Sequence, residues 1–356
     1  MAFELGAKTW KLGMAVSAAT PPWVRTVPAG DLAQVATVVA RARQRFGLAA
    51  TAPVESCYEA GRDGFWVHRA LTAAGFHNRV VDSASIEVSR RARRSKTDWL
   101  DAVKLVTMLQ RACGGEARVW REVRVPTEAE EAARHLSRAR EALVAETTRV
   151  RNQMRSLVAT LGARLPERRR GPWWTAVRDW QGAPLPAVVQ QRLAQAQARL
   201  ALLDEQIAAL ERQQRQEVAA DPGLTRLVQL KGIGVTSTAV LDAEGLRWRE
   251  FRNRRQVGGM LGFRPVPFQS GEAARDVGID RAGNKRWRSI MVQLAWRWLR
   301  WQPSSDLAQW FERRFAHGGK RARRIGIVAL ARKLLVALWR WVTHGVVPAG
   351  AVLQAA

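Results

Sequence analysis

The sequence predicts a protein of the α/β plus α class, with an α/β domain over residues 1–125, a helical hairpin over 126–221 and a mainly helical domain over 222–356. Three observations predict this class. Short strands alternate with helices only in the first third of the chain. A nearly complete heptad pattern occupies the middle, and two helices joined by a glycine turn open the last third.

The elements of the first domain are predicted from apolar alternation and from turn signals. Period-2 patterns predict strands over 9–16, 23–27, 52–59 and 78–82. Helices are expected from Asp31 to Phe46 and from Gly64 to Ala74, each followed by a glycine that ends it. The first strands should be antiparallel, and this order of elements fits an α/β layer of the ribonuclease H type.

Two carboxylates, Asp98 and Asp101, stand three residues apart at the start of an apolar-periodic run. If the run is a helix, both lie on one face of its first turn and repel each other. A divalent cation of the Mg²⁺ or Mn²⁺ class, which takes hard oxygen ligands, would relieve that repulsion. The alternative is that Asp98 caps the helix while Asp101 lies in solvent.

A third carboxylate, Glu59, ends a predicted strand and precedes a loop. Catalytic carboxylates often stand at such strand ends, because the sheet holds them rigidly while the site stays open. The alternative interpretation is an ion pair between Glu59 and Arg62.

Positive charge dominates the composition. Lysine and arginine number 58 against 31 aspartate and glutamate residues, which gives a net charge of +27. This excess predicts a nucleic-acid partner. The segment just before the aspartate pair would attract a phosphate backbone through Arg90, Arg91, Arg93, Arg94 and Lys96.

The same sequence argues against membrane proteins and zinc modules. We find no run of about 18 apolar residues and no signal peptide, so no membrane association is expected. The two cysteines, Cys57 and Cys113, are too few for a cysteine-rich zinc module and indicate no disulfide framework. We therefore expect a soluble protein of a reducing compartment.

A heptad pattern in the middle of the chain predicts a coiled-coil seam. Apolar residues recur in steps of four and three at Val189, Leu193, Ala196, Leu200, Leu203, Ile207 and Leu210. An earlier helix from Thr127 carries a broader apolar stripe, and a long basic loop joins the two helices. We expect a helical hairpin that forms a homodimer. The alternative is an intramolecular bundle, in which the two helices cover each other.

The last third begins with a helix, a Gly-x-Gly turn and a second helix around residues 230–239. In helix-hairpin-helix modules such a turn presents backbone N–H groups to a DNA phosphate. We therefore assign Lys231, Gly232 and Gly234 to nucleic-acid binding. The alternative is a tight turn whose two glycines serve the backbone alone.

Ser270 precedes a glycine in a predicted loop rich in arginine. A serine hydroxyl is a poor nucleophile unless its proton is removed or the phosphate it attacks is neutralised. None of the five histidines has a useful spacing to it, so guanidinium groups and a metal ion are the expected aids. The alternative is an ordinary turn. We assign further nucleic-acid contacts to Arg275, Asn284, Lys285 and Arg286.

Four groups of residues form motifs in a fixed order. They are Tyr58-Glu-Ala-Gly61 with Gly64-Phe-Trp66, Lys96-Thr-Asp-Trp-Leu-Asp-Ala102, Lys231-Gly-Ile-Gly234, and Ser270-Gly271 with Gly278-Ile-Asp-Arg-Ala-Gly-Asn284. Together they resemble the DEDD insertion-sequence family of bridge-RNA-guided transposases and recombinases, which is related to the Piv invertases. The resemblance covers nearly the whole chain. It implies a RuvC-like ribonuclease H domain, a coiled coil and a C-terminal transposase domain with a nucleophilic serine.

The resemblance also implies catalytic residues. Glu59, Asp98 and Asp101 match three of the family's four acids, and Ser270 matches its serine. Family members usually have aspartate at the end of the first strand, where this chain offers Glu4 and so departs from the pattern. The implied cofactor is Mg²⁺ or Mn²⁺, held by these four carboxylates. The implied reaction cuts and rejoins DNA through a covalent phosphoserine intermediate.

The partners implied by the resemblance are a guide RNA, called bridge RNA, and donor and target DNA. A homodimer through the coiled coil and a tetramer on DNA are also implied, with each site formed by domains of different protomers. The implied location is the bacterial cytoplasm, with association with the nucleoid during activity. Two other classes stay open: a non-catalytic RNA- or DNA-binding scaffold, supported in the sequence only by Glu4, and a metal nuclease that uses water.

Overall fold

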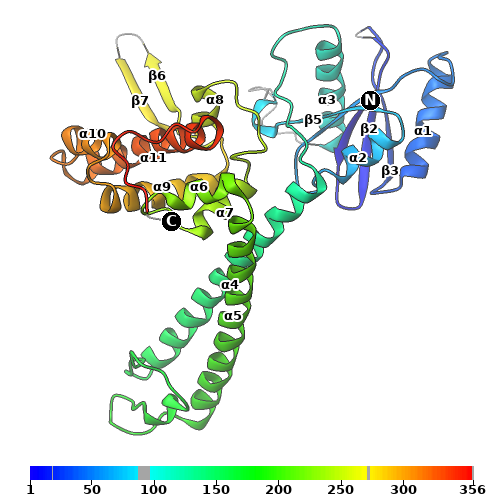
Figure 1. Ribbon diagram of the computed structural model, residues 1–356. Coiled ribbons are helices and arrows are strands. Elements are labelled where there is room, and N and C mark those ends of the chain that lie inside the picture. Colours follow the sequence, from blue (N-terminus) through cyan, green and yellow to red (C-terminus); the bar gives the residue numbers. More distant parts are fainter. Residues whose placement is uncertain (18, 87–96, 271–272, 355–356) are drawn as a thin grey trace. The chain divides into compact units, whose positions relative to one another are not determined.

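The structure, a computed structural model, describes residues 1–17, 19–86, 97–270 and 273–354 (Figure 1). Its helices and strands combine into a mixed α/β protein. The chain divides into two compact units, Met1–Pro126 and Thr127–Ala356. Within the described ranges, no helix is both long enough and apolar enough to cross a membrane.

A five-stranded sheet forms the centre of the first unit, in the order β3-β2-β1-β4-β5. Strand β2 is antiparallel to both β1 and β3, as predicted, whereas β4 runs parallel to β1 and β5 runs parallel to β4. The strands in chain order are β1 Ala2–Leu5, β2 Thr9–Met14, β3 Trp23–Pro28, β4 Glu55–Glu59 and β5 His77–Val81.

Helices cover both faces of this sheet, because alternate strand residues point to opposite sides. Phe3 and Tyr58 share a core with helices α1 and α2, whereas Ala2 and Cys57 share a core with α3. The helix α1 begins as predicted after Asp31, whose carboxylate accepts the backbone N–H of Gln34 at 2.9 Å. The helical elements are α1 Leu32–Arg45, α2 Trp66–Ala73, the short η1 Ser83–Ser85 and α3 Asp98–Cys113.

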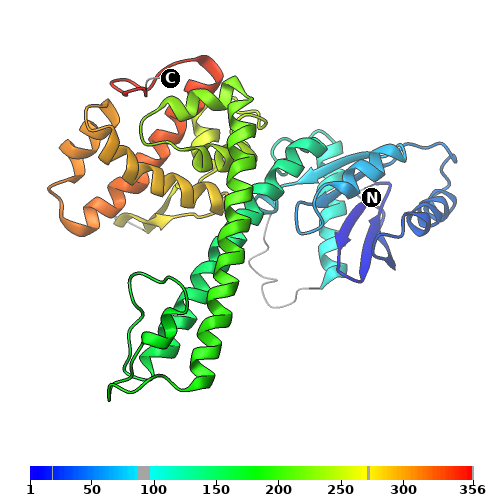
Figure 2. The same ribbon diagram turned by 60° about the horizontal axis from the view of Figure 1, so that its bottom comes forward.

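The second unit begins with two long helices, α4 Glu128–Ala159 and α5 Ala187–Ala219, which lie against each other in Figures 1 and 2. The predicted start at Thr127 is confirmed by a capping box with Glu130. The loop between the helices contains the short element η2 Trp173–Ala176.

The heptad seam of α5 is covered within the same chain. Its residues Val189, Leu193, Leu200 and Leu203 are buried in one core with α4 residues such as Met154. The intramolecular alternative therefore accounts for the seam, and the seam gives no support to a dimer. A heptad pattern shows that a helix face is covered but does not say which helix covers it.

The rest of the second unit is mainly helical, as predicted. Two buried tryptophans, Trp287 and Trp298, form its core with Leu334 and Leu338, so these aromatic rings serve packing. The helices are α6 Pro222–Gln229, α7 Val235–Ala243, α8 Arg254–Gly259, α9 Lys285–Trp301, α10 Asp306–Phe315 and α11 Gly319–His344.

A β-hairpin lies where the sequence predicted a loop. Strands β6 Pro265–Ser270 and β7 Ala273–Ile279 are antiparallel. Two prolines in β6 argue against a strand, since proline cannot donate to a ladder. Both strands of a two-stranded sheet are edges, however, and a bulge lies between Pro265 and Pro267, so the prolines are tolerated here.

Candidate functional site

The sheet brings two of the candidate carboxylates to the same edge. In the parallel pairing of β1 with β4, Phe3 lies opposite Tyr58, and continuing this register by one residue places Glu4 level with Glu59. Both glutamates alternate with residues that pack on α1 and α2, so both lie on the face that α3 covers. Glu59 is exposed and Glu4 is half-buried.

Helix α3 brings the two aspartates to that edge. Near its middle, the carbonyl of Leu105 lies 3.9 Å from the thiol of Cys57. At its end, Cys113 lines a cavity with Glu55, the first residue of β4. The helix therefore runs opposite to β4, and its start at Asp98 lies toward the edge where β4 ends.

The first turn of α3 also decides one alternative. Its cap is Thr97, whose hydroxyl accepts the backbone N–H of Leu100 at 3.3 Å, so Asp98 is not the cap. Asp98 is exposed and Asp101 is half-buried. Both carboxylates stabilise the helix through its dipole, because negative charge is favoured in the first turn.

The alternative partner of Glu59 is likewise excluded. Arg62 lies 3.7 Å from Asp63, and among the described residues no ion pair joins Arg62 to Glu59. The exposed Glu59 is therefore not held by the arginine that the sequence suggested.

The four carboxylates fit a divalent metal ion by chemistry but do not form a metal site in this arrangement. Carboxylate oxygens are the ligands that Mg²⁺ and Mn²⁺ prefer. Across the described ranges, however, no three residues among His, Cys, Asp and Glu are grouped closely enough to hold a metal. Binding of an ion would therefore require these side chains to move together.

Cys57 offers no alternative nucleophile in this unit. Cys57 and Cys113 are free thiols, and Cys57 is fully buried. Burial raises the pKa of the Cys57 thiol to about 12, so the thiol stays protonated at neutral pH.

Several predicted nucleic-acid contacts fall where the structure gives no side-chain information. Arg90, Arg91, Arg93, Arg94 and Lys96 lie outside the described residues. Arg275 belongs to β7 by its backbone.

Ser270 lies at the end of a strand rather than in a loop. It is the last residue of β6, in register with Ala273 at the start of β7. The predicted nucleophile therefore stands at the tip of the β-hairpin.

The glycine turn between α6 and α7 has the predicted helix–turn–helix arrangement. Gly232 has a φ of +96°, and a Cβ there would lie 3.0 Å from the Cβ of Trp301, so both backbone and space favour glycine. Gly234 caps α7. Lys231 is exposed, with its ammonium 5.7 Å from the ring centre of Trp301.

Gln302, which the sequence analysis did not identify, fixes this turn. Its side chain is fully buried. Its amide nitrogen donates to the carbonyls of Lys231 at 2.9 Å and Val352 at 2.8 Å, and its amide oxygen accepts the N–H of Val352 at 2.7 Å. No local sequence pattern indicates such a residue, because its partners are far away in the chain.

The cluster at the start of α9 has internal partners. Asn284 caps the helix by accepting the backbone N–H of Arg286 at 2.9 Å, and donates to Glu244 at 2.8 Å. Arg286 pairs with Glu141 at 3.1 Å and with Glu244 at 3.5 Å, whereas Lys285 is exposed. Nucleic-acid contact by these residues stays a prediction, since the internal contacts already explain two of them.

Glu244 itself is the centre of a buried charge cluster that the sequence did not reveal. It is 2% exposed and lies 3.5 Å from Arg138 of α4 as well as from Arg286. The pKa of the neighbouring Arg134 is lowered, first by burial and then by Arg138. A buried charge needs such partners to offset its desolvation, so the cluster joins α4 to the base of α9.

The chain matches two families of transposases. Residues 224–309 match a family described as "Transposase IS116/IS110/IS902 family", and residues 31–162 match a DEDD family described as "Transposase". A protein of Sinorhizobium fredii, y4rJ, which carries the name of a transposase, is 42% identical over 342 residues, covering 92% of this chain and 86% of the relative.

Two further relatives are more distant. The transposase-named protein y4qE of Sinorhizobium fredii is 28% identical over 240 residues, covering 67% of this chain and 57% of the relative. The "Transposase for insertion sequence element IS1328" of Yersinia enterocolitica is 27% identical over 263 residues, covering 72% of this chain and 74% of the relative.

Proposed function

Because the chain belongs to the IS110 family of transposases, we propose that it is an RNA-guided DNA recombinase that uses Ser270 as its nucleophile. Family membership gives the general activity, which is the cleavage and transfer of DNA in transposition. The guide RNA and the serine come from the resemblance of the four motifs.

The proposed step needs no external energy source, because it exchanges one phosphodiester bond for another. The Ser270 hydroxyl attacks the phosphorus of a DNA phosphodiester, the bond to one deoxyribose oxygen breaks, and that oxygen takes a proton as it leaves. A serine phosphodiester remains. Attack by the hydroxyl of another strand reverses the chemistry, joins the strands and frees the serine.

Glu4, Glu59, Asp98 and Asp101 are the proposed ligands of a divalent cation. The register of β1 with β4 supports this assignment, because Glu4 and Glu59 are level with each other on the face of the sheet that α3 covers, and the first turn of α3 carries both aspartates. Bound there, the ion would offset negative charge on the phosphate.

The sheet also supports a RuvC-like fold for the first unit. Three antiparallel strands are followed by two that run parallel to the first, with helices on both faces. A homodimer and a tetramer on DNA belong to the same proposal. Because α4 covers the α5 seam, the subunit interface of these assemblies must lie elsewhere on the chain.

The decisive variant is Ser270→Ala. We expect it to lose cleavage, strand exchange and covalent protein–DNA adduct together, as measured by trapping the reaction in denaturant and mapping DNA-linked peptides by mass spectrometry. Ser289→Ala is the matched control, because Ser289 is exposed on α9 and should be replaceable.

Two outcomes would contradict the assignment of Ser270 as the nucleophile. Full cleavage without an adduct would identify a metal nuclease that uses water, and an adduct at another residue would move the nucleophile. RNA sequencing of material that copurifies with the protein tests the guide separately, and a sample free of a defined RNA would contradict it.

A further inference from the structure

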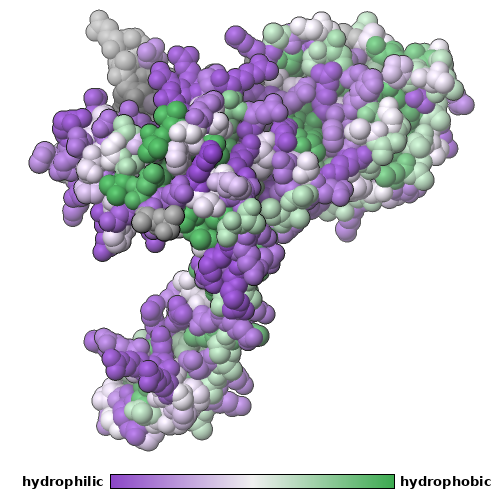
Figure 3. Space-filling view, in the orientation of Figure 1, coloured by the Kyte–Doolittle hydropathy of each residue, from purple (hydrophilic) through white to green (hydrophobic). Residues whose placement is uncertain are grey.

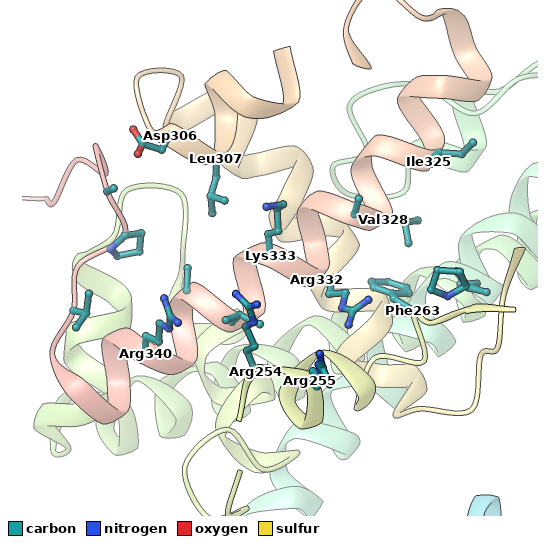
Figure 4. A pocket seen from close by; sticks show the side chains of 18 of the residues that line it. Arg254, Arg255, Phe263, Asp306, Leu307, Ile325, Val328, Arg332, Lys333 and Arg340 are labelled. Atoms are coloured by element: carbon teal, nitrogen blue, oxygen red, sulfur yellow. The ribbon is translucent and has the colours of Figure 1, made fainter. Parts of the chain in front are cut away.

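A groove of about 810 Å³ lies in the second unit, outside every site assigned so far (Figure 4). Its walls come from α8, α10, α11 and residues 346–349. Its volume falls within the range of about 300–1,000 Å³ that is typical of ligand sites. No residue predicted to bind nucleic acid lines it.

Helix α11 contributes more lining residues to the groove than any other element. Ile325, Val328, Arg332, Val336 and Arg340 line it at spacings of three and four, which places them along a single side of the helix. The apolar members of this stripe are not fully covered, since Ile325 is 56% exposed. In Figure 3 a hydrophobic strip bordered by hydrophilic residues runs over the region of α10 and α11.

Cations surround this apolar floor. Five of them line the groove, namely Arg254, Arg255, Arg332, Lys333 and Arg340. The lining contains one carboxylate, Asp306. Figure 4 shows it at the upper left, away from Arg254, Arg255 and Arg332, which lie lower in the view. As far as the structure describes the chain, none of the five cations forms an ion pair with a carboxylate, so their charge is available to an anion.

We propose that this groove binds a single strand of DNA, with its phosphates on the cations and its sugars and bases on the apolar floor. Grooves for single strands combine these two features. A duplex would present mainly phosphates and leave the floor without a partner. A second copy of this chain is disfavoured, because each copy carries a net charge of +27.

DNA is preferred to RNA because the lining side chains offer little to accept a hydrogen bond from a 2′-hydroxyl. That group is what distinguishes the two polymers, and it needs hydrogen-bonding partners. Among the side chains that line the groove, only Asp306 can accept a hydrogen bond.

The groove also lies beside the β-hairpin. Pro265 and Ile279, which pair at its base, are lining residues. Ser270 lies five positions beyond Pro265, a distance of about 17 Å along a strand. A DNA strand in the groove would thus lie within a few nucleotides of the proposed nucleophile. This proposal depends on the family's action on DNA and does not depend on Ser270 being the nucleophile.

The test is the double variant Lys333→Gln with Arg340→Gln, both exposed residues of α11. Binding of the RNA-free full chain to a fluorescent oligothymidylate of about 12 nucleotides is measured by anisotropy against salt. Loss of two phosphate contacts should lower the salt slope by about 1.4 and weaken binding roughly 25-fold at about 0.1 M salt. All proteins carry Ser270→Ala, so the result is independent of strand cleavage.

The matched control is Lys320→Gln with Arg323→Gln, which removes the same charges from exposed positions of α11 that do not line the groove. It should retain affinity within about threefold. Equal losses in both variants, or no loss in the groove variant, would overturn the proposal. The proposal would also be overturned if a DNA duplex bound as tightly as oligothymidylate and lost the same affinity in the groove variant. Tighter binding of oligouridylate than of oligothymidylate would overturn the preference for DNA.

Discussion

At Gly13 the backbone of helix α3 comes very near to the sheet. A Cβ at this position would lie 2.8 Å from the carbonyl oxygen of Ala102, a backbone atom that cannot turn aside. Glycine inside a strand often marks such a close approach of another backbone. The position of α3, and with it that of Asp98 and Asp101, therefore depends on one missing methyl group.

We expect Gly13→Ala to lower the free energy of unfolding by about 1–3 kcal/mol, because α3 must shift away from the sheet. Urea denaturation measures the change. The control is Gly61→Ala, where the added Cβ would meet only the carbonyl of Glu59 at 3.7 Å. Equal stability of the Gly13 variant and the parent would show that the helix adjusts without cost.

Residue-level prediction succeeded where the signal was local. Asp31 as a cap and the glycine turn at 232–234 were both predicted correctly, because caps and turns are chosen by their own backbone needs. Glu244 and Gln302 were missed, since each is defined by partners distant in sequence. The exclusion of Asp98 as a cap also needed the structure, because Thr97 beside it serves equally well.

At the scale of elements, the long helices α4 and α5 were predicted, but the sequence left open whether they cover each other or pair with a second chain. The buried seam residue Leu203 is 4% exposed within one chain, whereas its neighbour Leu202 is 55% exposed. This difference between adjacent leucines allows a matched pair of variants.

Leu203→Glu should lower the free energy of unfolding by about 3 kcal/mol or more, since it leaves a carboxylate among apolar side chains. Leu202→Glu should change it little. Thermal unfolding measures stability and light scattering measures mass. A halved mass for Leu203→Glu at unchanged stability would instead make the seam an interface between two chains.

Element prediction failed at the β-hairpin for a physical reason. Prolines normally indicate a loop, and the sequence offered no sign that both strands of the pair would be edges. The parallel pairing of β1 with β4, which makes Glu4 and Glu59 neighbours, likewise depends on a register that strand patterns alone do not give.

The whole chain contains separate cores in its two units. One unit buries residues such as Trp10 and Leu105, and the other buries Trp287, Leu334 and Leu203. A unit with its own core has what it needs to fold alone.

Residues 127–356 expressed alone should therefore fold, with a cooperative thermal transition and a stability of about 5–15 kcal/mol. Circular dichroism tests this, and the single-strand binding of the groove should survive in the fragment. A fragment that aggregates or melts without a transition would show that the first unit is needed for folding.

The contact between Gln302 and Val352 makes the turn around Lys231 depend on the codons near Val352. The codons for the tail specify part of the glycine turn around Lys231, because that turn and the tail share one buried amide. A frameshift or a stop codon shortly ahead of Val352 would leave all four motifs encoded and still remove the partner of Gln302, which holds the turn. A gene copy that encodes every motif can therefore still encode an inactive protein.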